Sequence, residues 1–164
     1  MDSLTQIVLG ASVGELVLGK KIGNKAILWG AVAGTIPDLD VLLRYFTDEI
    51  SATEMHRGFS HSVIFAVLIA PILGWLAKRI HFKINEVSFK DWTKLFFWTT
   101  VTHPLLDAHT TWGTQFFWPL NYRLAYQNIF VVDPLYTLPF LFFLTLTFCY
   151  KKENSLRSKF NNIG

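Results

Sequence analysis

The apolar stretch at residues 62–77 reads SVIFAVLIAPILGWLA and contains no charged side chain. A straight helix needs ~20 apolar residues to cross ~30 Å of hydrocarbon, so this stretch falls slightly short of a full span. Further apolar stretches lie at residues 96–106 and 134–150, and weaker, glycine-rich ones at residues 4–19 and 26–43. The pattern predicts an all-α fold, a polytopic membrane helical bundle of about five short spans.

The composition favours a membrane protein over a soluble one. Of 164 residues, 51% are hydrophobic and 16% aromatic, which is more than a soluble core of this size requires. Residues 1–19 carry no basic side chain, so we expect them not to act as a cleaved signal peptide. Cys149 is the single cysteine, which excludes a disulfide framework and a thiolate zinc cluster. We assign residues 1–150 to one membrane-embedded helical domain and residues 151–164 to a basic cytoplasmic tail.

Lysine and arginine are distributed unevenly between the connections that join the apolar stretches. Twelve of the fifteen fall in the first connection, the third connection and the C-terminal tail: Lys20, Lys21, Lys25, Lys78, Arg79, Lys83, Lys90, Lys94, Lys151, Lys152, Arg157 and Lys159. The positive-inside rule assigns such connections to the cytoplasm, so the N-terminus is expected outside and the C-terminus inside. Glu15, near the inner end of the first stretch, is expected to pair with Lys20 or Lys21. Because the basic residues form no continuous stripe, we expect the partner to be the lipid bilayer and not nucleic acid.

Seven aspartate and histidine side chains fall at the outer ends of the spans in this topology: Asp38, Asp40, His56, His61, His103, Asp107 and Asp133. A charged side chain at the bilayer centre costs about 2.5–3.5 kcal/mol on insertion scales, and such residues by default indicate a functional site. The basic residues on the same side, Arg44, Arg57 and Arg123, are too few to neutralise the acidic ones. The grouping predicts a site for one or two divalent cations, and mixed imidazole and carboxylate ligands suit zinc, manganese or iron.

His103 and Asp107 form the strongest candidate pair. Their i, i+4 spacing puts both on nearly the same side of a helix, within reach of one cation. Pro104 removes a backbone hydrogen bond there, so the helix is expected to kink or to start at this point and open toward a ligand. The alternative is a buried ion pair at a helix end.

His56 and His61 are five residues apart, about 140° around a helix, so both cannot face one point from a continuous helix. Gly58 allows the chain to turn, and Ser60 is a suitable N-cap. We therefore expect His61 on the first turn of the third span and His56 in the preceding loop. Two interfacial histidines without a metal are the alternative.

Asp38 and Asp40 follow Pro37, which disfavours helix in the residue before it, so their carboxylates can converge from an extended or restarted segment. They could equally be the N-cap and first-turn acids of a new helix, stabilised by its dipole. Asp133 has the same two interpretations, because Pro134 suits the first position of a helix that Asp133 would cap.

Six short motifs are spread along residues 1–139: MDSLTQ at 1–6, GTIPDLD at 34–40, HRGFSHS at 56–62, THPLLD at 102–107, WGTQ at 112–115 and DPLY at 133–136. Together they resemble the YdjM-like family of bacterial inner-membrane proteins, which are catalogued as predicted membrane-bound metal-dependent hydrolases. The combination is specific, whereas any one motif alone is not. The resemblance implies a multi-span protein of the bacterial inner membrane with a metal site built from histidine and aspartate.

The first functional hypothesis is a membrane-bound metal-dependent hydrolase, in which a cation lowers the pKa of a bound water to near neutrality. The first cation would be held by His56, His61, His103 and Asp107. A second cation would be held by Asp38, Asp40 and Asp133. Catalytic roles fall to Asp38, His61 and Asp107.

The substrate hypothesis rests on two arginines. Arg57 and Arg123 are rare cations on an otherwise acidic face, and an arginine fork matches phosphate oxygens, so a phosphoester at the membrane surface, for example of a lipid, is the favoured substrate. Two other functions stay open. One is a protein that binds or transports metal without catalysis, and the other is a structural protein whose histidines and aspartates only cap helices.

Overall fold

The computed structural model describes residues 2–45 and 58–164. Six α-helices and two 3-10 helices make up this part of the chain, and its single isolated β-bridge joins Thr114 to Leu124. The bounds are α1 Ser3–Ile22, α2 Asn24–Thr35, η1 Pro37–Tyr45, η2 Phe59–His61, α4 Val63–Ile80, α5 Phe89–Asp107, α6 Pro134–Cys149 and α7 Ser155–Ile163. The all-α prediction is confirmed for the described residues.

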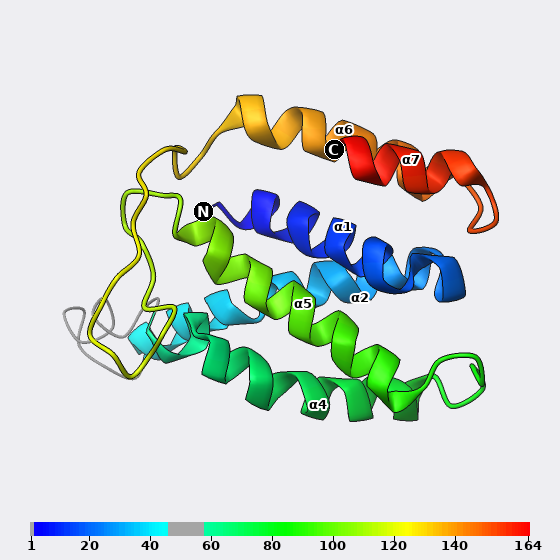
Figure 1. Ribbon diagram of the computed structural model, residues 1–164, viewed down its shortest axis with the longest axis horizontal. Coiled ribbons are helices and arrows are strands. Elements are labelled where there is room, and N and C mark those ends of the chain that lie inside the picture. The colour runs from blue at the N-terminus through cyan, green and yellow to red at the C-terminus, as the bar shows by residue number, and fades with distance from the viewer. Residues whose placement is uncertain (1, 46–57) are drawn as a thin grey trace.

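Figure 1 shows α1, α2, α4, α5 and α6 lying alongside one another as one bundle. The left side of the figure shows one end of the bundle. The first residues of α1, α4 and α6 lie there, together with the last residues of α2 and α5. We name the two ends by their side chains: the His/Asp end comprises residues 34–42, 58–62 and 103–133, and the lysine end comprises residues 20–25, 78–90 and 150–154. The predicted ligands among the described residues and most of the basic residues are thus at opposite ends.

α1 and α2 approach closely because glycines face each other. Gly10 and Gly14 on α1 lie against α2, and Gly30 and Gly34 on α2 lie against α1, each pair at i, i+4 spacing. A Cβ at Gly10, Gly14 or Gly30 would collide with a carbonyl oxygen of the facing helix. Small residues at this spacing are typical of helix packing in membranes, where van der Waals contact drives association. The close contact brings the last turn of α2 beside the first turns of α1.

The apolar core and the apolar exterior are both extensive. Trp92, Leu95 and Phe96 of α5 are fully buried and pack with alanines of α2 and α4. Large apolar side chains are also exposed, among them Leu68 and Ile72 on α4. Exposed apolar surface of this kind suits contact with lipid.

One helix of the described chain, α4, is long and apolar enough to cross a membrane by length and composition, and α6 is apolar but shorter. The five spans therefore stay a prediction. One helix boundary differs from the expected one. α5 begins at Phe89, before the apolar stretch, because Ser88 and Asp91 form a capping box that starts the helix in polar sequence. α2 gives way to a 3-10 helix at Pro37, where a break or restart was expected, because proline has no amide hydrogen for an α-helical bond.

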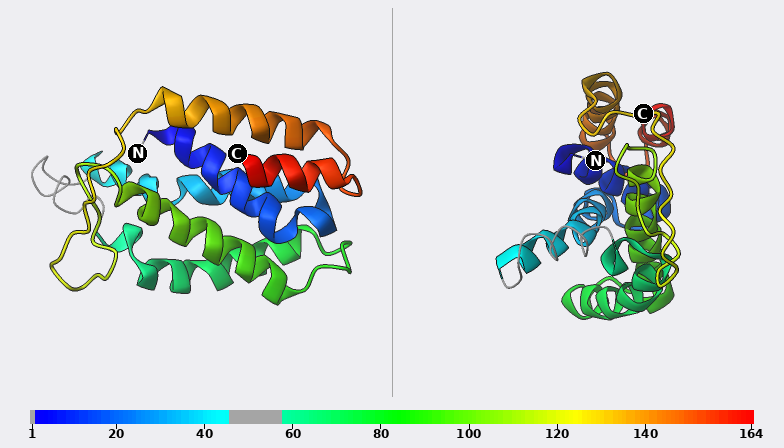
Figure 2. Two further views of the ribbon diagram at one scale, coloured as in Figure 1. Left: turned by 45° about the horizontal axis from the view of Figure 1, so that its top comes forward. Right: turned by 90° about the vertical axis from the view of Figure 1, so that its left-hand side faces the viewer.

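The C-terminal residues fold back onto the bundle, where α7 packs against α6 and α1 (Figure 2). Buried Arg157 donates from Nε and Nη2 to the two Glu15 oxygens, at 2.6 and 2.5 Å, and from Nη1 to Asn24 Oδ1 at 2.6 Å. The expected pairing of Glu15 with Lys20 or Lys21 is wrong, because the arginine fork matches the carboxylate, whereas both lysines lie on the exposed rim. The cytoplasmic location of this segment stays a prediction.

Candidate metal centre

Four side chains from three segments converge at the His/Asp end. Asp38 lies on η1, His61 on η2, and His103 and Asp107 on the last turns of α5. One ligand atom of each lies within 4.8 Å of those of the other three. His61 and Asp107 are fully buried and His103 is 1% exposed, whereas the Asp38 side chain keeps 27% of its surface open. Asp38 is therefore the open side of the group.

Five of the distances among these atoms are close to those between the ligands of one metal ion. His61 Nε2 lies 3.2 Å from His103 Nε2, 3.4 Å from Asp38 Oδ1 and 3.5 Å from Asp107 Oδ2. His103 Nε2 lies 3.2 Å from Asp38 Oδ1 and 3.9 Å from Asp107 Oδ2. Ligands bound at about 2.0–2.2 Å around a tetrahedral ion stand about 3.3–3.6 Å apart. Four atoms at this spacing can hold one cation between them.

The end of α2 orients His103. Its Nδ1 lies 2.6 Å from the carbonyl oxygen of Gly34, which can only accept a hydrogen bond, so Nδ1 carries a proton. This carbonyl belongs to the last turn of α2, where carbonyls lack a partner within the helix. In the neutral ring the nitrogen without a proton is then Nε2, which faces the centre of the group. Metal-binding histidines are commonly fixed in this way.

Ser60 and Asp40 orient the second histidine. Ser60 Oγ donates to Asp40 Oδ2 at 2.6 Å and lies 3.0 Å from His61 Nδ1, so its oxygen accepts from Nδ1. Nε2 of this ring therefore also faces the centre. The expected N-cap at Ser60 is wrong: Ser62 caps α4, because the three preceding residues form a separate 3-10 turn. Asp40 Oδ2 lies 3.4 Å from His61 Nδ1, the ring nitrogen that points away from the centre of the group.

Gln6 holds the Asp107 carboxylate from α1. Its Nε2 donates to Asp107 Oδ1 at 3.0 Å, and the Gln6 side chain is fully buried. The other carboxylate oxygen, Oδ2, then faces the two histidines. Gln6 was not among the predicted site residues. A side-chain amide in the first turn of a glycine-rich apolar helix needs a partner when that turn is buried, and this was the signal that could have identified it.

The charges of the group depend on one another. Burial lowers the pKa of His61, but hydrogen bonds with Asp107, Asp38 and Asp40 outweigh burial and raise that pKa to about 10. Burial raises the pKa of Asp38, but hydrogen bonds from His103 and His61 outweigh it and hold the pKa well below its usual range. Without a cation, His61 carries an additional proton near neutral pH, and a cation that binds must displace this proton.

The other predicted site residues divide into two outside the described part of the chain and two in other positions. His56 and Arg57 are outside the described residues. Asp133 caps α6 by accepting from backbone amides of its first turn at 3.1 and 3.3 Å, and it is not one of the four convergent side chains. Arg123 is exposed in the connection between α5 and α6. The structure thus brings together four of the seven predicted ligands, with Asp40 supporting one of them.

Comparison with known proteins identifies the family. The inner membrane protein YbcI of Escherichia coli (strain K12) is 33% identical over 104 residues, which are 63% of this chain and 58% of that protein. This chain therefore covers less than two thirds of that relative. No solved structure matches the chain. Residues 1–161 match the model of the YdjM inner membrane protein family, which agrees with the resemblance carried by the six motifs. The chain belongs to the YdjM inner membrane protein family.

Proposed function

We propose that the protein is a membrane-bound hydrolase that depends on one divalent cation held by Asp38, His61, His103 and Asp107. The observation that carries this proposal is the convergence of two imidazole nitrogens and two carboxylate oxygens, with five of their mutual distances between 3.2 and 3.9 Å. Without a cation a proton on His61 joins these groups, and a cation that binds would take the place of that proton between the two Nε2 atoms and the carboxylate oxygens. Membership of an inner membrane protein family supports the location.

The chemistry that the cation would supply is a lower pKa of a bound water, which turns it into a nucleophile near neutral pH. Gly34 and Ser60 keep both histidines in the tautomer that binds a metal. Asp107 is buried and fixed, so its role is to hold charge. Asp38, the partly exposed member, lies on the side from which a substrate would arrive.

Coordination number bears on the identity of the ion. Four protein ligands fill a tetrahedral ion and leave no place for water, whereas catalytic sites keep an open position. An ion that takes five or six ligands, such as manganese or iron, or zinc expanded to five, fits a hydrolase built on these four residues.

The proposed substrate is a phosphoester presented at the outer surface of the inner membrane. Arg123 lies in the connection between α5 and α6, which runs at the His/Asp end (Figure 1), and its guanidinium group suits a phosphate oxygen. Arg57, next to the described residues, is the second candidate. The five-span topology puts this end outside, because the lysine end carries the residues that the positive-inside rule assigns to the cytoplasm.

Metal content and hydrolysis, measured together, test the function. We expect the wild-type protein, purified in mild detergent without chelator, to retain about one equivalent of metal and to cleave phosphomonoesters or phosphodiesters in mixed micelles. His103→Ala should lose both properties. His109→Ala is the matched control, because His109 lies at the same end and contacts Asn128 instead of the four ligands. Equal metal content in all three proteins would refute the site.

Reporter fusions test the topology. A reporter fused after Arg79 should be active in the cytoplasm, and one fused after Gln115 should be active outside. The reverse result would put the site on the inner face and remove the case for an outer substrate.

Metal binding or transport without catalysis is the second candidate. The observation that favours it is the number of protein ligands, since four of them with almost complete burial of three are typical of closed, structural sites. Metal retained by the wild type, lost in His103→Ala and unaccompanied by cleavage of phosphoesters, peptides or acyl esters would establish this function instead.

A further inference from the structure

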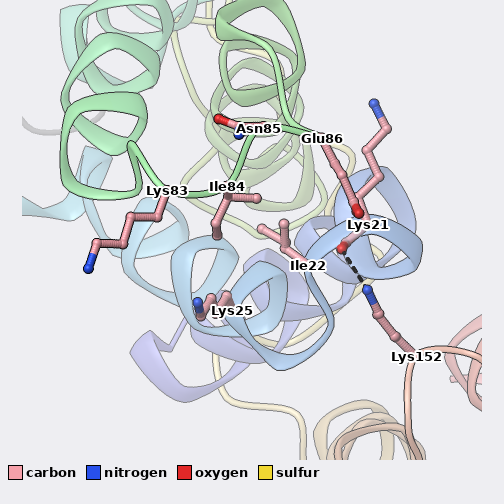
Figure 3. Close-up of a pocket in the computed structure, with 8 residues that line it drawn as sticks. All are labelled: Lys21, Ile22, Lys25, Lys83, Ile84, Asn85, Glu86 and Lys152. Atoms are coloured by element: carbon pink, nitrogen blue, oxygen red, sulfur yellow. Dashed lines mark hydrogen bonds between the residues drawn. The ribbon is translucent and has the colours of Figure 1, made fainter.

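A polar cavity lies at the lysine end, away from the metal centre. Its volume is about 490 Å³, and it lies between the end of α1, the start of α2, the connection from α4 to α5 and the segment after α6. Figure 3 shows the side chains that line it: Lys21, Ile22, Lys25, Lys83, Ile84, Asn85, Glu86 and Lys152. Three sequence segments that are far apart thus contribute to one cavity: residues 21–25, residues 83–86 and Lys152.

The lining has an excess of positive charge. Four of its eight residues are lysines, and Glu86 is the one acidic residue among them. Lys21 is partly neutralised by Asp91 outside the cavity, at 2.8 Å. Within the described residues, no ion pair joins Lys25 or Lys83 to a carboxylate. This excess of positive charge favours an anion in the cavity.

Part of the frame is fixed. Lys152 donates to the backbone carbonyl of Lys21 at 3.3 Å, which ties the segment after α6 to the end of α1 (Figure 3). α2 starts beside the cavity with no side-chain cap on its first amides, so the positive end of its dipole adds to the lysine charge. One lysine side chain thus anchors the frame to a backbone carbonyl, and the start of α2 adds positive potential that does not come from lysine.

We propose that this cavity binds the phosphate group of an anionic glycerophospholipid. The phosphate would sit between Lys25 and Lys83, and the apolar side chains of Ile22 and Ile84 would contact the glycerol backbone. Phe82 and Ile80, next to Lys83, are 66% and 53% exposed and offer apolar surface for the acyl chains. Basic cavities between helix ends on the cytoplasmic side of a membrane are a recognised form of anionic lipid site.

The test compares two pairs of lysine substitutions in the full chain. The first is Lys25→Gln with Lys83→Gln, and the control is Lys90→Gln with Lys94→Gln, which removes the same charge from exposed positions on α5 outside the cavity. Native mass spectrometry would measure binding of phosphatidylglycerol and of phosphatidylcholine to each protein released from detergent. We expect the cavity pair to weaken phosphatidylglycerol binding roughly 30-fold and the control pair to leave it nearly unchanged.

Three other outcomes are decisive. An equal loss in both pairs would show diffuse attraction to the lysine end and overturn the proposal. Equal binding of phosphatidylglycerol and phosphatidylcholine by the wild type would overturn the lipid assignment. If inorganic phosphate or glycerol phosphate then binds with the same dependence on Lys25 and Lys83, the cavity takes free phosphate instead of lipid. Unchanged melting temperatures of both variants would show that the differences do not come from unfolding.

Discussion

The two ends of the bundle handle buried charge in opposite ways. At the His/Asp end, imidazole nitrogens and carboxylate oxygens stand apart around a common centre, and Gln6, Gly34 and Ser60 hold them from outside. Next to the lysine end, the buried ionisable groups Glu15 on α1 and Arg157 on α7 contact each other directly at 2.5 and 2.6 Å. Groups held apart leave room for an ion, whereas a closed pair leaves none. The first arrangement therefore suits a binding site and the second fastens α7 to the bundle.

Breaking the closed pair should have the largest effect on the fold. We expect Arg157→Ala to destabilise the protein by about 3–5 kcal/mol, because Glu15 would stay buried without its cation. Thermal unfolding in detergent would measure this. The double variant Glu15→Leu with Arg157→Met should recover most of the loss, since no buried charge remains. Metal content per folded molecule should not change in either variant, and a loss of metal would show that the two ends are not independent.

Removing the ion from the His/Asp end should lower the stability of the protein. If the cation binds only the folded protein and is present at 100 to 1,000 times its dissociation constant, a chelator should cost about 2.7–4.1 kcal/mol. The melting temperature of the wild type should fall on chelation. That of Asp107→Asn should already be low and should not respond. If neither chelator nor added metal changes the melting temperature of the wild type, the protein holds no resident ion.

Asp40→Asn should weaken the site without removing a ligand. Asp40 acts on His61 through Ser60 and through Nδ1, and outer partners of this kind typically change metal affinity 10- to 100-fold. Competition with a chromophoric chelator would measure the affinity. Asp91→Asn at the lysine end is the matched control and should leave the affinity unchanged. Complete loss of metal in Asp40→Asn would make Asp40 a direct ligand.

Contacts between residues close in the sequence could be predicted from residue spacing, whereas contacts between distant segments could not. The pairing of His103 with Asp107 follows from i, i+4 spacing, and the presence of Asp38 and His61 follows from the ends of apolar stretches. The carbonyl of Gly34 has no side-chain signature, so the orientation of His103 could not be predicted. Glu15 and Arg157 are 142 residues apart, and their pairing depends on how α7 folds back.

The glycine contact between α1 and α2 has a similar explanation. The i, i+4 spacing of Gly10 with Gly14 and of Gly30 with Gly34 is visible in the sequence. Which helix faces which is not visible, because small residues permit close contact without choosing a partner. This contact sets the site, since it brings Gln6 on α1 and the Gly34 carbonyl on α2 to the same end of the bundle.

The smallest expected effect decides between the two interpretations of Asp133. If Asp133 is only the N-cap of α6, Asp133→Ala should lower the stability of the protein by about 1 kcal/mol and leave its metal content unchanged. Asp133→Asn separates the interpretations further, because asparagine caps a helix about as well as aspartate but is a much poorer ligand for a hard cation. We expect Asp133→Asn to match the wild type in both melting temperature and metal content. If it keeps its stability but loses metal, a second cation site that includes Asp133 exists, and the His/Asp end holds more than the four-ligand centre.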